Sequence, residues 1–385
     1  MDFNLSESLT AFQEADKDSF DISNADNLLD QVTGSLAVSL EAISNSSIYE
    51  SLEELVHAYP KLNKKEQKQV IYLVTSSLHN QAENSSNIIE NGETELFVAH
   101  KQYLEAYAYL AHCLLTYLGL EHIPSSNTNS KKVTNQALEV FKNNCTQLEN
   151  IMDAICAVFK LHLSKLFTTT PEKDLFVSSF TRPIYILMEN EPRVKVVGVK
   201  MYMFKVIAMA VKFHGHASAA QSAIVQNLTY FSHLNSMMAE LLQILNDQYD
   251  HFQLTEDVLR EVSNKEFNSN DNNGPKQISL FIVKVSELIP RILLKQMTLV
   301  SQLLNNSSYT LRCAVVEACG NIIIEISKDE DELERYKNQV SGLLDLLIER
   351  FLDQNPYVRT KAIQSILKLC EVDAKFTKYR QSFVE

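Results

Sequence analysis

Apolar residues recur every three or four positions near the end of the chain, which is the spacing of a helix with one buried face. Two such runs flank the polar stretch 353–359. The first consists of Val340, Leu343, Leu344, Leu347, Ile348 and Phe351, and the second of Val358, Ala362, Ile363, Ile366, Leu367 and Cys370. Pro356 cannot continue the first helix, but it suits the first turn of the second. The pattern predicts a hairpin of two helices joined by a tight turn.

The same pattern occurs one unit upstream. Apolar runs at 293–304 and 310–323 flank a polar turn, so that Arg312 and Arg359 stand in matching places, 359 − 312 = 47 residues apart. A third, weaker copy has its turn at 190–192. A two-helix repeat of ~40–47 residues is typical of HEAT and armadillo arrays. Because one hairpin cannot bury its apolar face alone, we expect an all-α fold, an α-solenoid of HEAT-like helical hairpins.

Each copy of the repeat carries a basic residue just inside its second helix, namely Lys195, Arg312 or Arg359. A cationic side chain at this place can donate to the carbonyl groups of the turn or to the next repeat. We favour that structural role over contact with a ligand, which stays open as the alternative.

Other segments predict further helices and their boundaries. Asn63 followed by Glu66 resembles a helix start with a capping box, and Pro290 should kink the helical pattern around it. The polar run 80–92 is expected to be a loop. Further helices are expected at 93–119, 134–169 (with a break near Asn143), 194–212, 217–247 and 255–264, with a linker at 124–132. The predicted domains are an acidic, flexible segment 1–25, a helical domain 26–170 and the HEAT-repeat solenoid 171–385.

The net charge is distributed unevenly. The chain carries −13 in total, and residues 1–60 hold 12 Asp and Glu against the single Lys17, or −11, which leaves −2 for the other 325 residues. Such an acidic segment usually stays solvated or binds a basic partner. Overall acidity therefore does not exclude a basic patch on the body.

Motifs for chemistry are scarce. The six cysteines form no CxxC pair, and neither a phosphate-binding glycine loop nor a nucleophile motif is present. His214-Gly215-His216 is better explained as a helix end with glycine than as a metal pair. No signal peptide and no apolar run of ~18 residues occurs. We therefore expect a soluble intracellular protein in a reducing compartment, with no enzymatic activity, cofactor, metal site or membrane association.

Thr170-Pro171-Glu172-Lys173 has two interpretations. Structurally, Thr170 would be an N-cap and Pro171 the first helical residue. Chemically, Thr-Pro-x-Lys matches the pattern of proline-directed kinases, and a phosphate at a helix N-terminus is electrostatically favoured. The structural interpretation is preferred, and phosphorylation of Thr170 is kept as the alternative.

Three stretches carry a resemblance to a known family. They are Arg182-Pro183-Ile184 with Met188 to Lys195, Tyr249-Asp250-His251 with Leu254 to Glu261, and Gly274-Pro275-Lys276 through Leu288 to Ser307-Ser308-Tyr309-Thr310-Leu311-Arg312-Cys313-Ala314-Val315-Val316-Glu317. Over roughly 180–330, with a looser match before 180, the chain resembles the D-type HEAT-repeat subunits of condensin, and the last stretch is the most specific. The Asn-rich loops look fungal. The chain ends without a polar closing repeat, so we expect it to be the N-terminal piece of a longer protein.

The resemblance implies a non-catalytic subunit that acts in mitotic chromosome condensation. Its implied partners are the kleisin subunit of condensin, the SMC ATPase subunits and double-stranded DNA, and its implied location is the nucleus and chromosomes, and also the cytoplasm. Candidates for DNA-phosphate contacts are Arg182, Arg193, Lys195 and Arg312. A HEAT-repeat adaptor of another complex, in transport or as a phosphatase scaffold, is the alternative.

Overall fold

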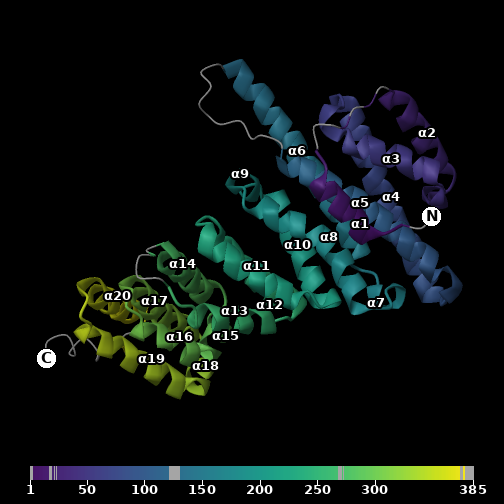
Figure 1. Ribbon diagram of the computed structural model, residues 1–385. Coiled ribbons are helices and arrows are strands. Elements are labelled where there is room, and N and C mark those ends of the chain that lie inside the picture. The colour runs from purple at the N-terminus through teal and green to yellow at the C-terminus, as the bar shows by residue number, and fades with distance from the viewer. Residues whose placement is uncertain are drawn as a thin grey trace. The chain divides into compact units, whose positions relative to one another are not determined.

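The computed structural model describes residues 3–16, 20, 22, 24–120, 131–267, 271, 273–372 and 376–377, without the side chains of 131–134 and 136. Within these ranges the chain forms α-helices and short 3-10 helices and no strand, so the predicted all-α class is confirmed (Figure 1). The chain divides into two compact units, Met1–Ala217 and Ser218–Glu385. Most of the predicted linker 124–132 lies outside the described residues.

The first unit is built from helices of very different length. They are α1 (Leu5–Glu14), α2 (Ala25–Val38), α3 (Ser46–His57), α4 (Lys64–Asn91), α5 (Phe97–Leu120), α6 (Lys131–Val158), α7 (Leu163–Leu166), α8 (Thr170–Met188), α9 (Glu191–Val194) and α10 (Val197–His214). Short 3-10 helices at Leu40–Ser44, Tyr59–Lys61 and Thr94–Leu96 connect some of them.

The long helices of the first unit form two layers. Helix α6 packs against both α4 and α10. It runs parallel to α10, because two contacts follow the same order along both helices. Asp153 lies 3.9 Å from Lys205, and the Phe159 carbonyl, just past the end of α6, accepts a hydrogen bond from His214 at the end of α10. Helices α5 and α8 form the other layer. They are joined by the ion pair between Lys101 and Glu172 and, further along, by a hydrogen bond from His112 to the Ser179 carbonyl. Parallel packing of successive hairpins is the arrangement expected of a helical-repeat array.

Helix α4 corrects the predicted loop at 80–92, because the helix continues to Asn91 and ends at Gly92 in the left-handed conformation (φ 73°). The predicted capping box of Asn63 and Glu66 at its start is confirmed. Two of the polar residues that suggested a loop, Gln81 and Ser85, are buried. Gln81 and Ser85 both lie 3.0 Å from His100 Nδ1 on α5, so their polarity serves a satisfied internal network rather than solvent exposure.

Helix α1 corrects the expectation that residues 1–25 form a flexible segment. Asn4 caps this helix by accepting from two backbone N–H groups. Leu5, Leu9 and Phe12 are buried, and the Phe12 ring packs edge-on against Tyr117 at a centroid distance of 5.6 Å. Three apolar residues on one face therefore hold this acidic segment to the body. Residues 1–2, 17–19, 21 and 23 lie outside the described residues.

The second unit contains α11 (Ala217–Tyr230, starting at the boundary), α12 (Leu234–Tyr249), α13 (Gln253–Ser263), α14 (Asn273–Leu288), α15 (Pro290–Lys295), α16 (Met297–Val300), α17 (Tyr309–Ile326), α18 (Glu330–Arg335), α19 (Lys337–Glu349) and α20 (Pro356–Val372). Pro290 starts a new helix after a break, as its missing N–H requires. The helix expected at 217–247 is interrupted between α11 and α12.

Helices α17 and α20 are the second helices of the two clearer predicted hairpins, and α17 packs against both α14 and α20. Their parallel register is visible at matched positions: Tyr309 stacks on Tyr357 with ring centroids 5.5 Å apart, and further along Lys361 binds Glu317 at 2.8 Å. Ser365 lies 3.1 Å from the place of a Cβ on Gly320, so glycine permits the close approach of α17 and α20. The predicted repeat is therefore present in the packing.

The boundary between the units does not fall at residue 170, where the sequence suggested it. Helix α8 packs against α5, and α10 against α6, so residues 171–217 complete the first unit. The Thr-Pro signal at 170–171 marks the start of a helix, and such a signal does not distinguish a domain boundary from a turn inside one domain.

Candidate binding groove

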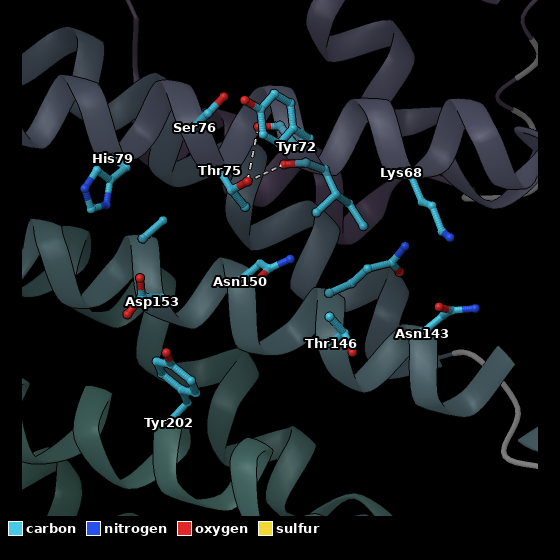
Figure 2. A pocket seen from close by; sticks show the side chains of 13 residues that line it. Lys68, Tyr72, Thr75, Ser76, His79, Asn143, Thr146, Asn150, Asp153 and Tyr202 are labelled. Atoms are coloured by element: carbon cyan, nitrogen blue, oxygen red, sulfur yellow. Dashed lines mark hydrogen bonds between the residues drawn. The ribbon is translucent and has the colours of Figure 1, made fainter. Parts of the chain in front are cut away.

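A groove of about 570 Å³ lies on the surface of the first unit between α4 and α6 and reaches α10 (Figure 2). We call it the α4–α6 groove. Its lining residues are Lys68, Ile71, Tyr72, Thr75, Ser76, His79, Asn143, Thr146, Gln147, Asn150, Asp153, Ala154 and Tyr202. Asn143, Thr146, Asn150 and Asp153 follow one another along α6, opposite the row from Lys68 to His79 on α4 (Figure 2).

Most of the residues that line the groove carry an amide or a hydroxyl group. Asn143 and Asn150 stand seven residues apart on α6, which places them on the same face two turns apart. Neither side chain forms a hydrogen bond with another described residue. By contrast, Thr75 and Thr146 donate to carbonyls of their own helices at 2.7 and 3.1 Å. The two asparagine amides are therefore the groups in the groove best placed to bond an external chain.

The two ends of the groove carry opposite charges. Lys68 lies at one end, together with Asn143, and Asp153 lies at the other, beneath His79 (Figure 2). Asp153 is 3.9 Å from Lys205. Burial raises the pKa of Tyr202, and the negative charge of Asp153 raises it further. Tyr72 adds an aromatic surface, since 73% of it is exposed.

This arrangement suits an extended peptide. From Asn143 to Asp153 the helix rises ~15 Å, which is the length of about four or five extended residues. Side-chain amides both donate and accept, so they match the N–H and C=O groups of a peptide backbone. The exposed tyrosine offers a large contact area at a small entropic cost.

Arg193, one of the predicted DNA-phosphate contacts, is only 2% exposed. Its guanidinium donates to the carbonyls of Gly119 at 2.8 Å and Leu118 at 2.6 Å. These carbonyls lie at the C-terminus of α5, where orphan acceptors and the negative end of the helix dipole favour a cation. The burial removes Arg193 from the DNA candidates and gives it a structural role.

Arg312 is also buried, at 4% exposure. It donates to the turn carbonyls of Asn306 and Ser307 at 2.8 and 3.1 Å, and two of its nitrogens bind Asp353 of the next repeat at 3.0 Å. Arg359 makes the equivalent bonds to the carbonyls of Asp353 and Gln354. The structural role favoured from the sequence is therefore confirmed for these two arginines, and Arg312 is withdrawn as a DNA contact.

Arg182 and Lys195 are both exposed. Lys195 forms an ion pair with Glu191 at 2.8 Å, one turn earlier on the surface. It does not bind the turn as its place in the repeat suggested. Arg193, two residues earlier, is the buried cation here, and its guanidinium binds the end of α5 and not the turn. Arg182 and Lys195 stay available as contacts for DNA phosphates.

The predicted cap at Thr170 is one residue away from the observed one. Thr169 is the N-cap of α8, and its Oγ1 accepts from the backbone N–H of Glu172 at 3.4 Å. Thr170 opens the helix with an exposed side chain, followed by Pro171. Its phosphorylation stays a prediction.

The histidine pair at the end of α10 has a structural explanation. His214 and His216 are buried, and Gly215 between them is left-handed at φ 76°, as expected of a helix end. His214 Nε2 donates to the Phe159 carbonyl at 2.9 Å. Within the described residues no group of three or more His, Cys, Asp or Glu is arranged to hold a metal ion. In the same part of the chain, no helix has both the length and the apolar character of a membrane span.

Comparison with known proteins identifies the family of this chain. Residues 64–220 match the family model described as "non-SMC mitotic condensation complex subunit 1, N-term", a range that contains all three helices of the α4–α6 groove. Condensin complex subunit 1 of Saccharomyces cerevisiae is 46% identical over 99% of this chain. The chain belongs to the condensin complex subunit 1 family. The resemblance noted in the sequence is thereby confirmed, and it extends well beyond residues 180–330.

More distant relatives agree with this assignment. Condensin complex subunit 1 of Schizosaccharomyces pombe is 34% identical over 93% of the chain, and that of Xenopus laevis 25% over 57%. The chain spans about a third of the two yeast proteins, 34% and 32% of their lengths. A solved structure of an engineered protein aligns over 94% of the chain and 98% of its own, with 15% identity and a TM-score of 0.27, too low to inform the fold.

The α4–α6 groove was not predicted from the sequence. Its signal is visible afterwards in the spacing of Asn143, Gln147 and Asn150, a polar stripe on one face of α6. That stripe reads as ordinary solvent exposure until α4 is known to lie beside it. The pairing of α4 with α6 is a tertiary contact over some 75 residues, which periodicity alone does not specify.

Proposed function

We propose that this chain is part of a non-catalytic scaffold subunit of condensin, located in the nucleus on chromosomes and acting in mitotic chromosome condensation. Membership of the condensin complex subunit 1 family supports this proposal. The helical-repeat architecture supports it independently, because such arrays bury their core between neighbouring hairpins and leave long surfaces for extended ligands.

The kleisin subunit is the partner we propose for the α4–α6 groove. A linker segment that is unfolded on its own can order itself on such a surface, with its backbone bonded to Asn143 and Asn150. The opposite charges at the two ends, Lys68 and Asp153, would fix the direction of the bound segment. The observation that carries this proposal is the pair of amides without internal partners, Asn143 and Asn150, that line the groove.

Contact with double-stranded DNA is a second part of the proposal. Arg182 and Lys195 are the exposed cations left from the sequence candidates. Such contacts neutralise phosphates, weaken as salt rises and read no base sequence. The SMC ATPase subunits would then be reached through the kleisin, which the resemblance implies links this subunit to them.

The test is co-expression of this chain with the condensin kleisin subunit, followed by size-exclusion chromatography. Co-elution in a defined ratio is expected. Elution as two separate, folded proteins would refute kleisin binding by these residues. Binding instead to a transport or phosphatase partner in a parallel co-expression would favour the adaptor alternative.

A further inference from the structure

A second, smaller cavity of about 320 Å³ lies in the first unit, away from the α4–α6 groove. Three segments enclose it: the connection from α6 to α7, the first turns of α8 and the end of α10. The side chains that matter here are Lys160, His162, Ser164, Lys173, Phe213 and His214. We call it the Lys160–Lys173 pocket.

The lining of this pocket is cationic and contains no carboxylate. Neither Lys160 nor Lys173 forms an ion pair with any described residue. Glu172, the carboxylate next to Lys173 in the chain, is bound to Lys101 at 3.2 Å instead. The two ammonium groups are therefore left without a counter-ion in a concave site, where a low-dielectric wall strengthens their field.

Lys173 lies beside the end of α10. Its Nζ is 4.0 Å from where a Cβ on Gly215 would stand, and the C-terminus of a helix favours a cation. The pKa of His214 is lowered to about 4, first by burial, and the positive charges of Lys173 and His162 contribute. The positive charges thus converge on the same small volume, and His214 stays neutral there at pH 7.

Three kinds of anionic group could bind such a site, and they differ in charge, in the number of acceptor oxygens and in shape. A phosphomonoester carries about −1.5 to −2 charges and three acceptor oxygens on a narrow side chain that enters a cavity. A phosphate of duplex DNA carries one charge and lies on the outside of a wide rod, so it suits an open surface. A carboxylate brings one charge and no third oxygen. Phe213, which is 57% exposed, provides an apolar contact for a neighbouring residue.

We propose that the Lys160–Lys173 pocket binds a phosphoserine or phosphothreonine side chain of a partner protein. Lys160 and Lys173 pair with the phosphate, His162 and Ser164 donate to its remaining oxygens, and Phe213 packs against the residue beside it. This site would make one contact of the subunit dependent on the phosphorylation state of the partner. It lies apart from the α4–α6 groove and does not rest on kleisin binding there.

The experiment uses the whole chain and a degenerate nonapeptide library with a fixed central phosphothreonine, labelled for fluorescence anisotropy. The unphosphorylated library and a short DNA duplex are measured in the same buffer. The test variant is Lys160→Ala/Lys173→Ala. The matched control is Lys142→Ala/Lys165→Ala, which removes two exposed lysines that do not line the pocket.

We expect the phosphorylated library to bind about tenfold more tightly than the unphosphorylated one. The test variant should lose that difference, and the control should keep it. Lys173→Gln alone, which preserves the length of the side chain, should weaken phosphopeptide binding without changing the unfolding temperature.

Two outcomes would overturn the proposal. One is equal binding of the two libraries to the unmodified chain. The other is a loss of DNA binding in the test variant that exceeds the loss in the control, with no preference for the phosphopeptide, which would make the pocket a contact for DNA.

Discussion

Replacement of Arg312 by methionine tests the role that the structure gives to the repeated arginine. The side chains of Arg312 and Asp353 are only 5% and 4% exposed. Methionine keeps much of the aliphatic volume but leaves the Asp353 carboxylate buried without its cation. It also leaves the carbonyls of Asn306 and Ser307 without a donor.

The magnitude follows from that burial. Removing one partner of a buried ion pair costs about 3–5 kcal/mol, chiefly because an uncompensated charge remains inside. For a unit of this size such a loss corresponds to a fall of roughly 10 °C in the unfolding temperature. Burial alone would raise the pKa of Asp353, but the bonds from Arg312 and from the Asn355 N–H outweigh it and lower the pKa. The contribution is therefore present at neutral pH and is lost as the pH falls through that lowered value.

The chain offers a matched control. Arg291 also binds a carboxylate with two nitrogens, Glu332 at 2.8 and 2.9 Å, but its side chain is 51% exposed. Arg291→Met should cost only about 0–1 kcal/mol, because solvent screens this pair. The chain has no tryptophan, so urea unfolding is best followed by far-UV circular dichroism, with calorimetry to separate the two units.

Equal destabilisation by the two substitutions would refute the reasoning. A second measurement bears on function. At a temperature where both variants are folded, the affinity for DNA should fall no more with Arg312→Met than with Arg291→Met. A selective loss with Arg312→Met would return this residue to the DNA contacts.

Three further substitutions or titrations test other parts of the account. Burial raises the pKa of Glu105 to about 7, so the folded state becomes less stable as the pH rises from 4.5 to 7. Glu105→Gln should therefore raise the free energy of unfolding at pH 8 by ~2 kcal/mol, measured by urea unfolding. No gain in stability would contradict the raised pKa of Glu105. Burial lowers the pKa values of His57, His214 and His216 to about 4, so stability that is present above pH 6.5 should be lost toward pH 4. Unfolding midpoints that do not change between pH 6.5 and pH 4 would argue against buried neutral imidazoles. Asn63→Ala removes the cap of α4 and should cost ~1 kcal/mol, and an unchanged midpoint would mean that this helix start contributes nothing.

Local chemistry explains what could be predicted from the sequence. Apolar spacing, Pro356, Pro290 and the capping box at Asn63 each act within a few residues, so the helices and the repeat could be inferred from them. The role of Arg312 followed from its place relative to the turn. The family resemblance rested on stretches long enough to be specific, and the comparisons confirmed it.

Tertiary context explains the errors. Gln81 and Ser85 looked like loop residues because their partner, His100, lies on another helix. The first residues were predicted to be mobile because they contain many acidic and few apolar residues. Leu5, Leu9 and Phe12 nevertheless form one buried face, which is enough to hold a helix against the body. The two candidate sites both depend on segments brought together from distant parts of the chain, which neither periodicity nor charge can align.

The affinity of the kleisin subunit for the α4–α6 groove tests the central claim most directly. Isothermal titration calorimetry would compare the unmodified chain with Asn143→Ala/Asn150→Ala and with the control Asn80→Ala/Asn87→Ala, whose two exposed amides share the seven-residue spacing on α4 but lie outside the groove. Two lost backbone bonds should weaken binding about tenfold in the groove variant, while the control binds as the unmodified chain does. Equal affinity for all three proteins would contradict the account and place any kleisin contact elsewhere on the chain.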